Sequence, residues 1–208
     1  MSNPLVSTII IAHGLQETVF GVDHPLADGE TVRDGKVLHV GNFNDNEEIG
    51  CFRRWKVIQK CKESGLLKEQ YIHSQDDDLL FYQDALLILL QAHKEGKGTL
   101  ISGVPGRSYV NGVYRFNDCR GECTLVLGRS IFTEVDTICA AVLRATMPTE
   151  VLKQDDICLS FLCLNRHFSA DCKFRDLPAP SALSQNTSLH LARRTMAVRY
   201  FISTRDAL

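Results

Sequence analysis

The sequence has no excess of basic charge and no long hydrophobic run, and both shortages exclude classes of function. Its 23 lysine and arginine residues stand against 25 aspartate and glutamate residues, which gives a formal net charge of −2. Because binding to a phosphate backbone needs a basic surface, we expect no nucleic acid as the main partner. The longest apolar stretches, 5–12 and 85–90, are far shorter than the roughly 20 residues of a membrane-spanning helix, so we expect no membrane span.

Signals of secretion and of internal repetition are also missing. The first four residues carry no basic side chain ahead of Leu5, whereas a secretory signal begins with basic residues before its apolar segment. We therefore predict a cytoplasmic protein whose eight cysteines are reduced thiols, since a chain of 208 residues buries a sufficient core without disulfides. No repeat or low-complexity tract divides the chain, which favours one compact domain over residues 1–208.

Local signals predict about three helices. A capping-box pattern, apolar residues at a spacing of three and a closing glycine indicate a helix over 46–64. An acidic triplet followed by a long apolar run indicates a central core helix that begins near Leu79 and ends at Gly96. A second capping-box pattern indicates a helix over 134–145.

Most other apolar segments are typical of β-strands. The segment 6–12 is rich in β-branched residues, as in a strand that is buried on both faces. We expect strands over 6–12, 36–43, 99–102, 109–110, 113–116, 123–127, 157–164 and 195–203, with a tight turn at Asn111-Gly112 between the two of them that it joins. Because helices and strands do not alternate in regular βα units, we predict an α+β fold with a mainly antiparallel sheet and about three helices.

Several residues suit a cysteine-based catalytic site. A thiolate nucleophile needs a helix N-terminus to lower its pKa, a histidine to carry its proton, and a carboxylate or amide to orient that histidine. Cys51 lies near the start of the first predicted helix, and Asn46 precedes it as a candidate oxyanion donor. His167 lies late in the chain, and Asp171 and Asp176 follow it as candidate orienting groups.

This order resembles the papain-like leader proteases of some RNA viruses. Those proteases place an amide side chain shortly before a Cys-aromatic pair and the histidine late in the chain, as do Asn46, Cys51-Phe52 and His167 here. The resemblance implies a small cysteine hydrolase with Cys51 as nucleophile and His167 as general base. The alternative is that Cys51 packs in the core beside its aromatic neighbours, as free cysteines usually do.

A second group of soft ligands could hold zinc. The four residues fall within fifteen positions: Cys158, Cys163, His167 and Cys172. The two cysteines that are five apart lie on a predicted strand and point to opposite faces, so they share one ion only if the strand bends. Core thiols are the favoured alternative, and we predict no metal and no cofactor.

The apolar segment that ends at His13-Gly14 is similar to strand ends in two enzyme families. In α/β-hydrolases such a dipeptide helps to form the oxyanion hole, and the nearest nucleophile motif here surrounds Ser130 but lacks its second glycine. In histidine phosphatases the phosphate site needs an arginine where Ala12 stands. The alternative is a histidine in a turn with no chemical role.

We favour a non-catalytic function because each catalytic pattern departs from its family at a required position. The predicted protein is an interaction module, a regulatory or accessory factor whose loops 14–35 and 165–187 bind another protein. The alternative is a small hydrolase that uses the Cys51–His167 pair. The two hypotheses differ in whether a reactive thiol is required.

Overall fold

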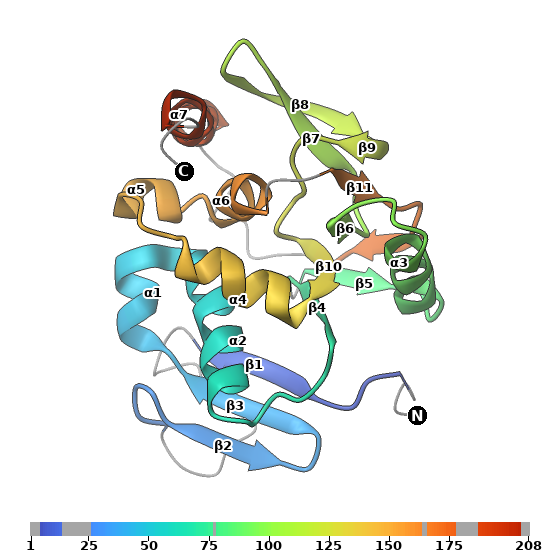
Figure 1. Cartoon of the computed structure of the whole chain (residues 1–208), viewed down its shortest axis with the longest axis vertical. Helices are drawn as coiled ribbons and strands as arrows, with labels where there is room; N and C mark the ends of the chain where they lie inside the picture. Colours follow the sequence, from blue (N-terminus) through green and yellow to red (C-terminus); the bar gives the residue numbers. More distant parts are fainter. Residues whose placement is uncertain (1–4, 14–25, 77, 164–165, 178–186, 205–208) are drawn as a thin grey trace.

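The computed structural model describes residues 5–13, 26–76, 78–163, 166–177 and 187–204 (Figure 1). The helical segments are, in chain order, α1 (Phe43–Ile49), the 3₁₀ turn η2 (Gly50–Phe52), α2 (Arg53–Glu63), α3 (Ala85–Lys94), α4 (Val135–Leu143), α5 (Thr149–Leu152), α6 (Asp155–Leu162) and α7 (Thr187–Thr204). The strands are β1 (Ile9–His13), β2 (Thr31–Asp34), β3 (Val37–Gly41), β4 (Tyr71–Gln75), β5 (Leu79–Phe81), β6 (Leu100–Ser102), β7 (Gly106–Val110), β8 (Val113–Cys119), β9 (Gly121–Cys123), β10 (Ser130–Glu134), β11 (His167–Ser169) and β12 (Phe174–Asp176). The α+β class is confirmed, but the expectation of about three helices is too low.

The strands form several small sheets rather than one. The largest has five strands in the order β4-β10-β6-β11-β9, and a second has three in the order β1-β3-β2. Two further pairs, β5–β12 and β7–β8, are antiparallel. The prediction of a mainly antiparallel sheet is confirmed only in part, because the β1–β3 and β6–β11 pairs are parallel.

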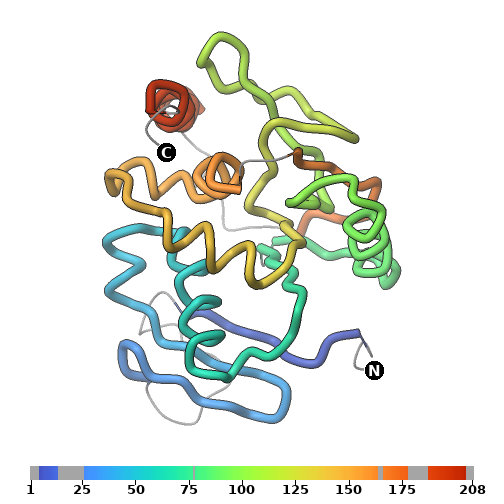
Figure 2. Tube along the Cα trace, in the orientation of Figure 1, coloured from blue at the N-terminus to red at the C-terminus, as the bar shows by residue number. Residues whose placement is uncertain are grey.

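Most of the helices lie together on one side of the five-stranded sheet, and the three-stranded sheet lies at the bottom of the view in Figure 1, below α1. In Figures 1 and 2, α1, α2, α4, α5 and α6 stack along one side, while the five-stranded sheet and α3 lie opposite them. The main core fills the space between these parts. Its fully buried side chains include Phe52, Trp55, Leu100, Ile131, Ile138 and Leu159. A smaller core joins α3 to the strands beneath it through Leu89, Ile101 and Phe132.

Strong local signals gave three segments correctly. The region 46–64 is helical, although Gly50 at φ 58° interrupts it, because a left-handed residue cannot continue a right-handed helix. The helix predicted over 134–145 is α4. The Asn111-Gly112 turn joins β7 to β8, with both residues at positive φ as a two-residue hairpin requires.

The helix expected from Leu79 begins six residues later, at Ala85. Leu79–Phe81 form β5 instead, because the backbone there pairs with β12. The helix α3 is also not central, since Leu87 on its outer face is 53% exposed. It ends as expected before Gly96, which has a φ of 66°.

Two expected strands are helices, and a third is less buried than predicted. Residues 157–162 belong to α6, and residues 195–203 belong to α7. At 18 residues α7 is the longest described helix, and no helix in the described ranges is long and apolar enough to cross a membrane. The strand β1 leaves Ile9 and Ile11 exposed, so it is not buried on both faces.

Candidate functional site

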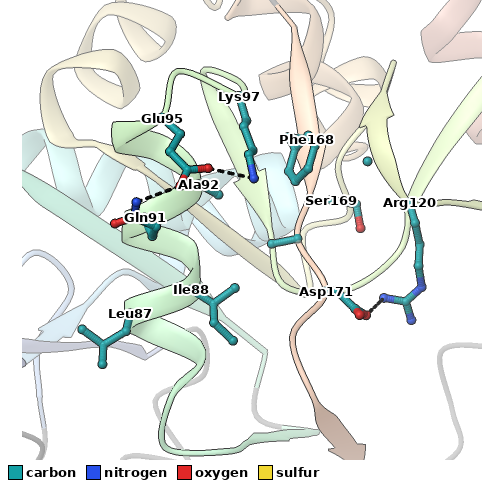
Figure 3. A pocket seen from close by; sticks show the side chains of 12 residues that line it. Leu87, Ile88, Gln91, Ala92, Glu95, Lys97, Arg120, Phe168, Ser169 and Asp171 are labelled. Carbon is teal, nitrogen blue, oxygen red and sulfur yellow. Dashed lines mark hydrogen bonds and ion pairs between the residues drawn. The ribbon is translucent and has the colours of Figure 1, made fainter.

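A groove of about 800 Å³ lies between α3 and the end of the five-stranded sheet that β11 and β9 form (Figure 3). One wall comes from α3 and the residues after it: Leu87, Ile88, Gln91, Ala92, Glu95 and Lys97. The other comes from β11 and the turn between β8 and β9: Arg120, Gly121, Phe168, Ser169, Ala170 and Asp171. A volume of this size is typical of ligand sites, and this one is open to solvent.

Charged side chains on both walls of the groove are already paired. Lys97 Nζ lies 2.8 Å from Glu95 Oε2 and 5.3 Å from the centre of the Phe168 ring. Across the groove, Arg120 Nη1 lies 3.0 Å from Asp171 Oδ1. Figure 3 shows these two pairs apart from each other, with Leu87 and Ile88 of α3 below the Glu95–Lys97 pair. The two pairs contribute equal numbers of positive and negative charges. The groove therefore offers apolar surface beside charged side chains whose charges cancel.

The apolar character of α3 on two faces produces the groove wall. Its inner face buries Ala85, Leu89 and Ala92, which lie at helical spacing, against the sheet. Its outer face then carries Leu87, which has no such covering. The sequence analysis missed this site because it interpreted an apolar run as a core helix. An apolar residue out of phase with the buried set was the available signal.

Two of the predicted catalytic residues, Cys51 and Asn46, lie beside arginines. Cys51 is in the η2 turn at the surface, and the partial burial of its thiol together with the Asp155 carboxylate raises its pKa. A raised pKa opposes formation of the thiolate that a cysteine nucleophile needs. Asn46 Oδ1 accepts a hydrogen bond of 2.7 Å from Arg53 Nε.

The other two, His167 and Asp176, have partners of their own. His167 is buried in β11, where its Nε2 donates a 2.8 Å hydrogen bond to the Ser160 carbonyl, and burial lowers its pKa. Asp176 lies 2.6 Å from Arg129 Nη2. Within the described residues no hydrogen bond or ion pair joins Cys51 to His167. The cysteine hydrolase hypothesis stays a prediction, and these contacts give it no support.

The proposed zinc ligands lie in two separate cores. Cys158 and Cys163 belong to the main core, whereas Cys172 belongs to the smaller core under α3. Cys158 Sγ donates to the Val151 carbonyl at 2.9 Å, as a packed thiol does. In the parts of the chain that the structure describes, no three histidine, cysteine, aspartate or glutamate side chains gather to hold a metal ion.

His13 of the His13-Gly14 dipeptide and Ser130 of the serine motif each contact another histidine. His13 Nε2 lies 3.0 Å from His39 Nδ1 with the rings stacked, while Gly14 lies outside the described residues. Ser130 Oγ lies 3.0 Å from His73 Nε2, a partner that sequence reasoning did not find. Burial lowers the pKa of His73 to about 4, which keeps its ring neutral at pH 7. Ser130 is 0% exposed, which makes this serine–histidine pair structural rather than accessible to a substrate.

A second polar group surrounds the start of α6. Arg54 Nη1 lies 2.8 Å from Asp76 Oδ1, and its Nε lies 3.4 Å from Asp155 Oδ2. Burial raises the pKa of Asp155 to about 6 and outweighs the attraction of Arg54. These groups join the end of β4 to α2 and α6, and we interpret them as a structural link.

Replacing Asp155 by asparagine should change how stability depends on pH. Because the folded pKa is raised, the native chain keeps the Asp155 proton where the unfolded chain has lost it, so this group's contribution falls as pH rises from about 4 through about 6. Asparagine has no proton to lose. We expect Asp155→Asn to gain on the order of 2 kcal/mol relative to wild type between pH 4 and pH 7, measured by urea unfolding.

Asp45→Asn is the matched control with the opposite sign. Burial acts to raise the pKa of Asp45, but the hydrogen bond from Asn42 and the charges of Lys56 and Lys60 lower it overall. Its stabilising contribution is therefore present above the unfolded pKa and is lost in acid. We expect the free energy of unfolding of Asp45→Asn to fall relative to that of wild type as pH rises. Parallel pH profiles for the two variants would contradict the assignment for Asp155.

Comparison with known proteins identifies no relative that could assign a function to the groove. The chain matches no protein-family model and no curated protein. Much of the two loops predicted to bind a partner, 14–25 and 178–186 within them, lies outside the described residues. Of the groups described above, the groove combines exposed apolar surface with polar side chains at its edge, so it is the strongest candidate for binding.

Proposed function

We propose that this protein is a non-catalytic interaction module that binds an apolar segment of another protein between α3 and β11. The observation that carries the proposal is Leu87, which is 53% exposed and lines the groove together with the apolar side chains of Ile88 and Phe168. Because about half of this side chain is still exposed, its burial by a partner contributes on the order of 1 kcal/mol. A cytoplasmic location with reduced cysteines is part of the same proposal.

The charges around the groove support an apolar ligand over a charged one. Lys97 and Arg120 each already have a carboxylate partner, and a ligand of either sign would have to displace one of them. An apolar chain segment leaves both pairs intact while it covers Leu87, Ile88 and Phe168. The open groove also admits a segment that continues at both ends, as a bound peptide does.

Peptide selection with matched variants tests the proposal. A random linear peptide library is selected on the purified wild-type protein, and the affinities of the enriched peptides are measured for Leu87→Glu and Leu143→Glu. Both leucines are exposed on helices, but Leu143 lies on α4, outside the groove. We expect Leu87→Glu to weaken binding about tenfold to a hundredfold and Leu143→Glu to leave it unchanged.

Two outcomes would overturn the proposal. The first is that no peptide is enriched on the wild-type protein. The second is that both variants bind the enriched peptides as tightly as wild type does, which would place the binding surface elsewhere. Circular dichroism of each variant verifies that it is folded before binding is measured.

A further inference from the structure

Two cysteines stand on either side of the turn between β8 and β9. Cys119 is the last residue of β8, and Cys123 is the last residue of β9. Between them the chain reverses at Gly121, which has a φ of 76° that favours glycine. Cys119 Sγ donates to the Glu122 carbonyl at 3.2 Å, so this thiol points back across the turn toward β9.

A glycine on the neighbouring strand brings the second thiol to the same place. Gly106 of β7 is the direct partner of Cys119 in the β7–β8 pair, and opposed residues on antiparallel strands point to the same face. A Cβ atom at Gly106 would lie 2.6 Å from Cys123 Sγ. The sulfur of Cys123 therefore occupies the space of the missing side chain, on the face that carries the Cys119 side chain.

The two thiols differ in how easily a reagent reaches them. Cys119 is half-buried, whereas Cys123 is buried. Burial raises the pKa of Cys123 to about 12, and a negative charge on Cys119 acts in the same direction. Cys119 is thus the residue that reacts first with a dissolved oxidant, and Cys123 is the residue held beside it.

We propose that Cys119 and Cys123 form a reversible disulfide by exchange with a low-molecular-weight disulfide such as oxidised glutathione. The Cys119 thiolate attacks one sulfur of the glutathione disulfide, forms a mixed disulfide and releases one glutathione thiolate. Cys123 then gives its proton to the released glutathione thiolate and attacks the Cys119 sulfur, and the second glutathione leaves as a thiolate that takes up the proton lost by Cys119. Two protein thiols are oxidised to one disulfide, and one glutathione disulfide is reduced to two thiols.

The disulfide would act on the wall of the groove. Arg120, between β8 and β9, and Gly121, the first residue of β9, line that wall. Arg120 forms the ion pair with Asp171. Closing a ring around them fixes the turn in one geometry and links the groove to the redox state of the thiols. This consequence rests on the proposed function, whereas formation of the disulfide does not.

Peptide mapping tests the disulfide directly. The full reduced chain is equilibrated in glutathione redox buffers, its remaining thiols are blocked by alkylation, and it is digested with trypsin without reductant. Trypsin cuts after Arg115, Arg120 and Arg129, so the disulfide joins peptide 116–120 to peptide 121–129. We expect this linked pair to carry most of the signal for both peptides under oxidising conditions and to disappear on reduction.

Cys123→Ser separates the disulfide from simple modification of Cys119. In this variant we expect glutathione to remain attached to peptide 116–120, with no linked pair. Glutathione on peptide 116–120 of this variant reports that the buffer oxidises Cys119. The proposal is overturned if Cys119 of this variant carries glutathione while the linked pair is absent from the wild-type chain, if Cys119 of this variant stays unmodified, or if the linked pair forms only after the protein is unfolded with urea.

Discussion

Replacing Arg194 by leucine lowers the free energy of unfolding by about 3–5 kcal/mol, because it leaves a buried carboxylate without its partner. Arg194 Nη2 lies 2.6 Å from Asp156 Oδ2, and the two side chains are 8% and 6% exposed. The guanidinium also lies 4.4 Å from the centre of the Tyr114 ring. Arg194 is on α7 and Asp156 on α6, so the loss falls on the contact that holds the C-terminal helix to the core.

Urea unfolding followed by circular dichroism measures this loss, with Arg193→Leu as the matched control. Arg193 is the neighbouring residue and is exposed, so its substitution should change stability by less than about 0.5 kcal/mol. The double variant Arg194→Leu with Asp156→Leu removes both charges and should recover part of the loss. Equal stability of the Arg194 and Arg193 variants would show that the buried ion pair does not hold α7 in place.

Replacing Trp55 by alanine lowers the free energy of unfolding by about 3–5 kcal/mol, since it leaves a large cavity in the main core. Trp55 is the one tryptophan in the sequence, and its side chain on α2 is 0% exposed. Its Nε1 is buried without a hydrogen-bond partner among the described residues. The indole therefore contributes through packing, against a cost of about 1–3 kcal/mol for its unpaired N–H group.

Trp55→Phe distinguishes packing from polarity at this position. Phenylalanine keeps most of the ring contacts and removes the unpaired N–H, so we expect less than half of the loss seen with alanine. Thermal unfolding followed by circular dichroism gives both values, with the 70% exposed Leu143→Ala as the surface control. If phenylalanine destabilises as much as alanine does, the void left by the ring is not the main source of the loss.

Segments with a strong local signal were predictable from the sequence, and segments defined by tertiary burial were not. Apolar spacing and Gly65 located α2, and the Asn-Gly pair located the turn between β7 and β8. By comparison, the capping boxes expected for the helices over 46–64 and 134–145 do not form, because neither α2 nor α4 has a side-chain cap hydrogen bond. By contrast, α6 buries nearly every one of its residues, so its apolar run has no periodicity that separates a helix from a strand. The buried positions of α7 are at helical spacing, but one of them is Arg194, whose partner lies 38 residues away.

In the candidate site, too, single residues were recognisable from local sequence patterns, whereas their partners in space were not. Ser130 was recognisable from a serine motif, but its partner His73 is 57 residues away and carries no local signal. The groove requires Leu87 and Phe168 to line the same space, and residues so far apart in the sequence are brought together by the packing of α3 against the sheet. Cys51 and His167 were linked by their order along the chain, which does not determine distance in space.

The strand order of the five-stranded sheet constrains how the chain can fold. Strand β11 lies between β6 and β9, although both precede it in the sequence by more than 40 residues. During synthesis β6 and β9 therefore leave the ribosome before β11, and the edge of each strand that will pair with β11 has no hydrogen-bond partner at that stage. The sheet closes only when β11 arrives and inserts between them, parallel to one neighbour and antiparallel to the other. Such non-local pairing is slow, so β6 and β9 keep strand edges that can pair with other chains until β11 has been synthesised.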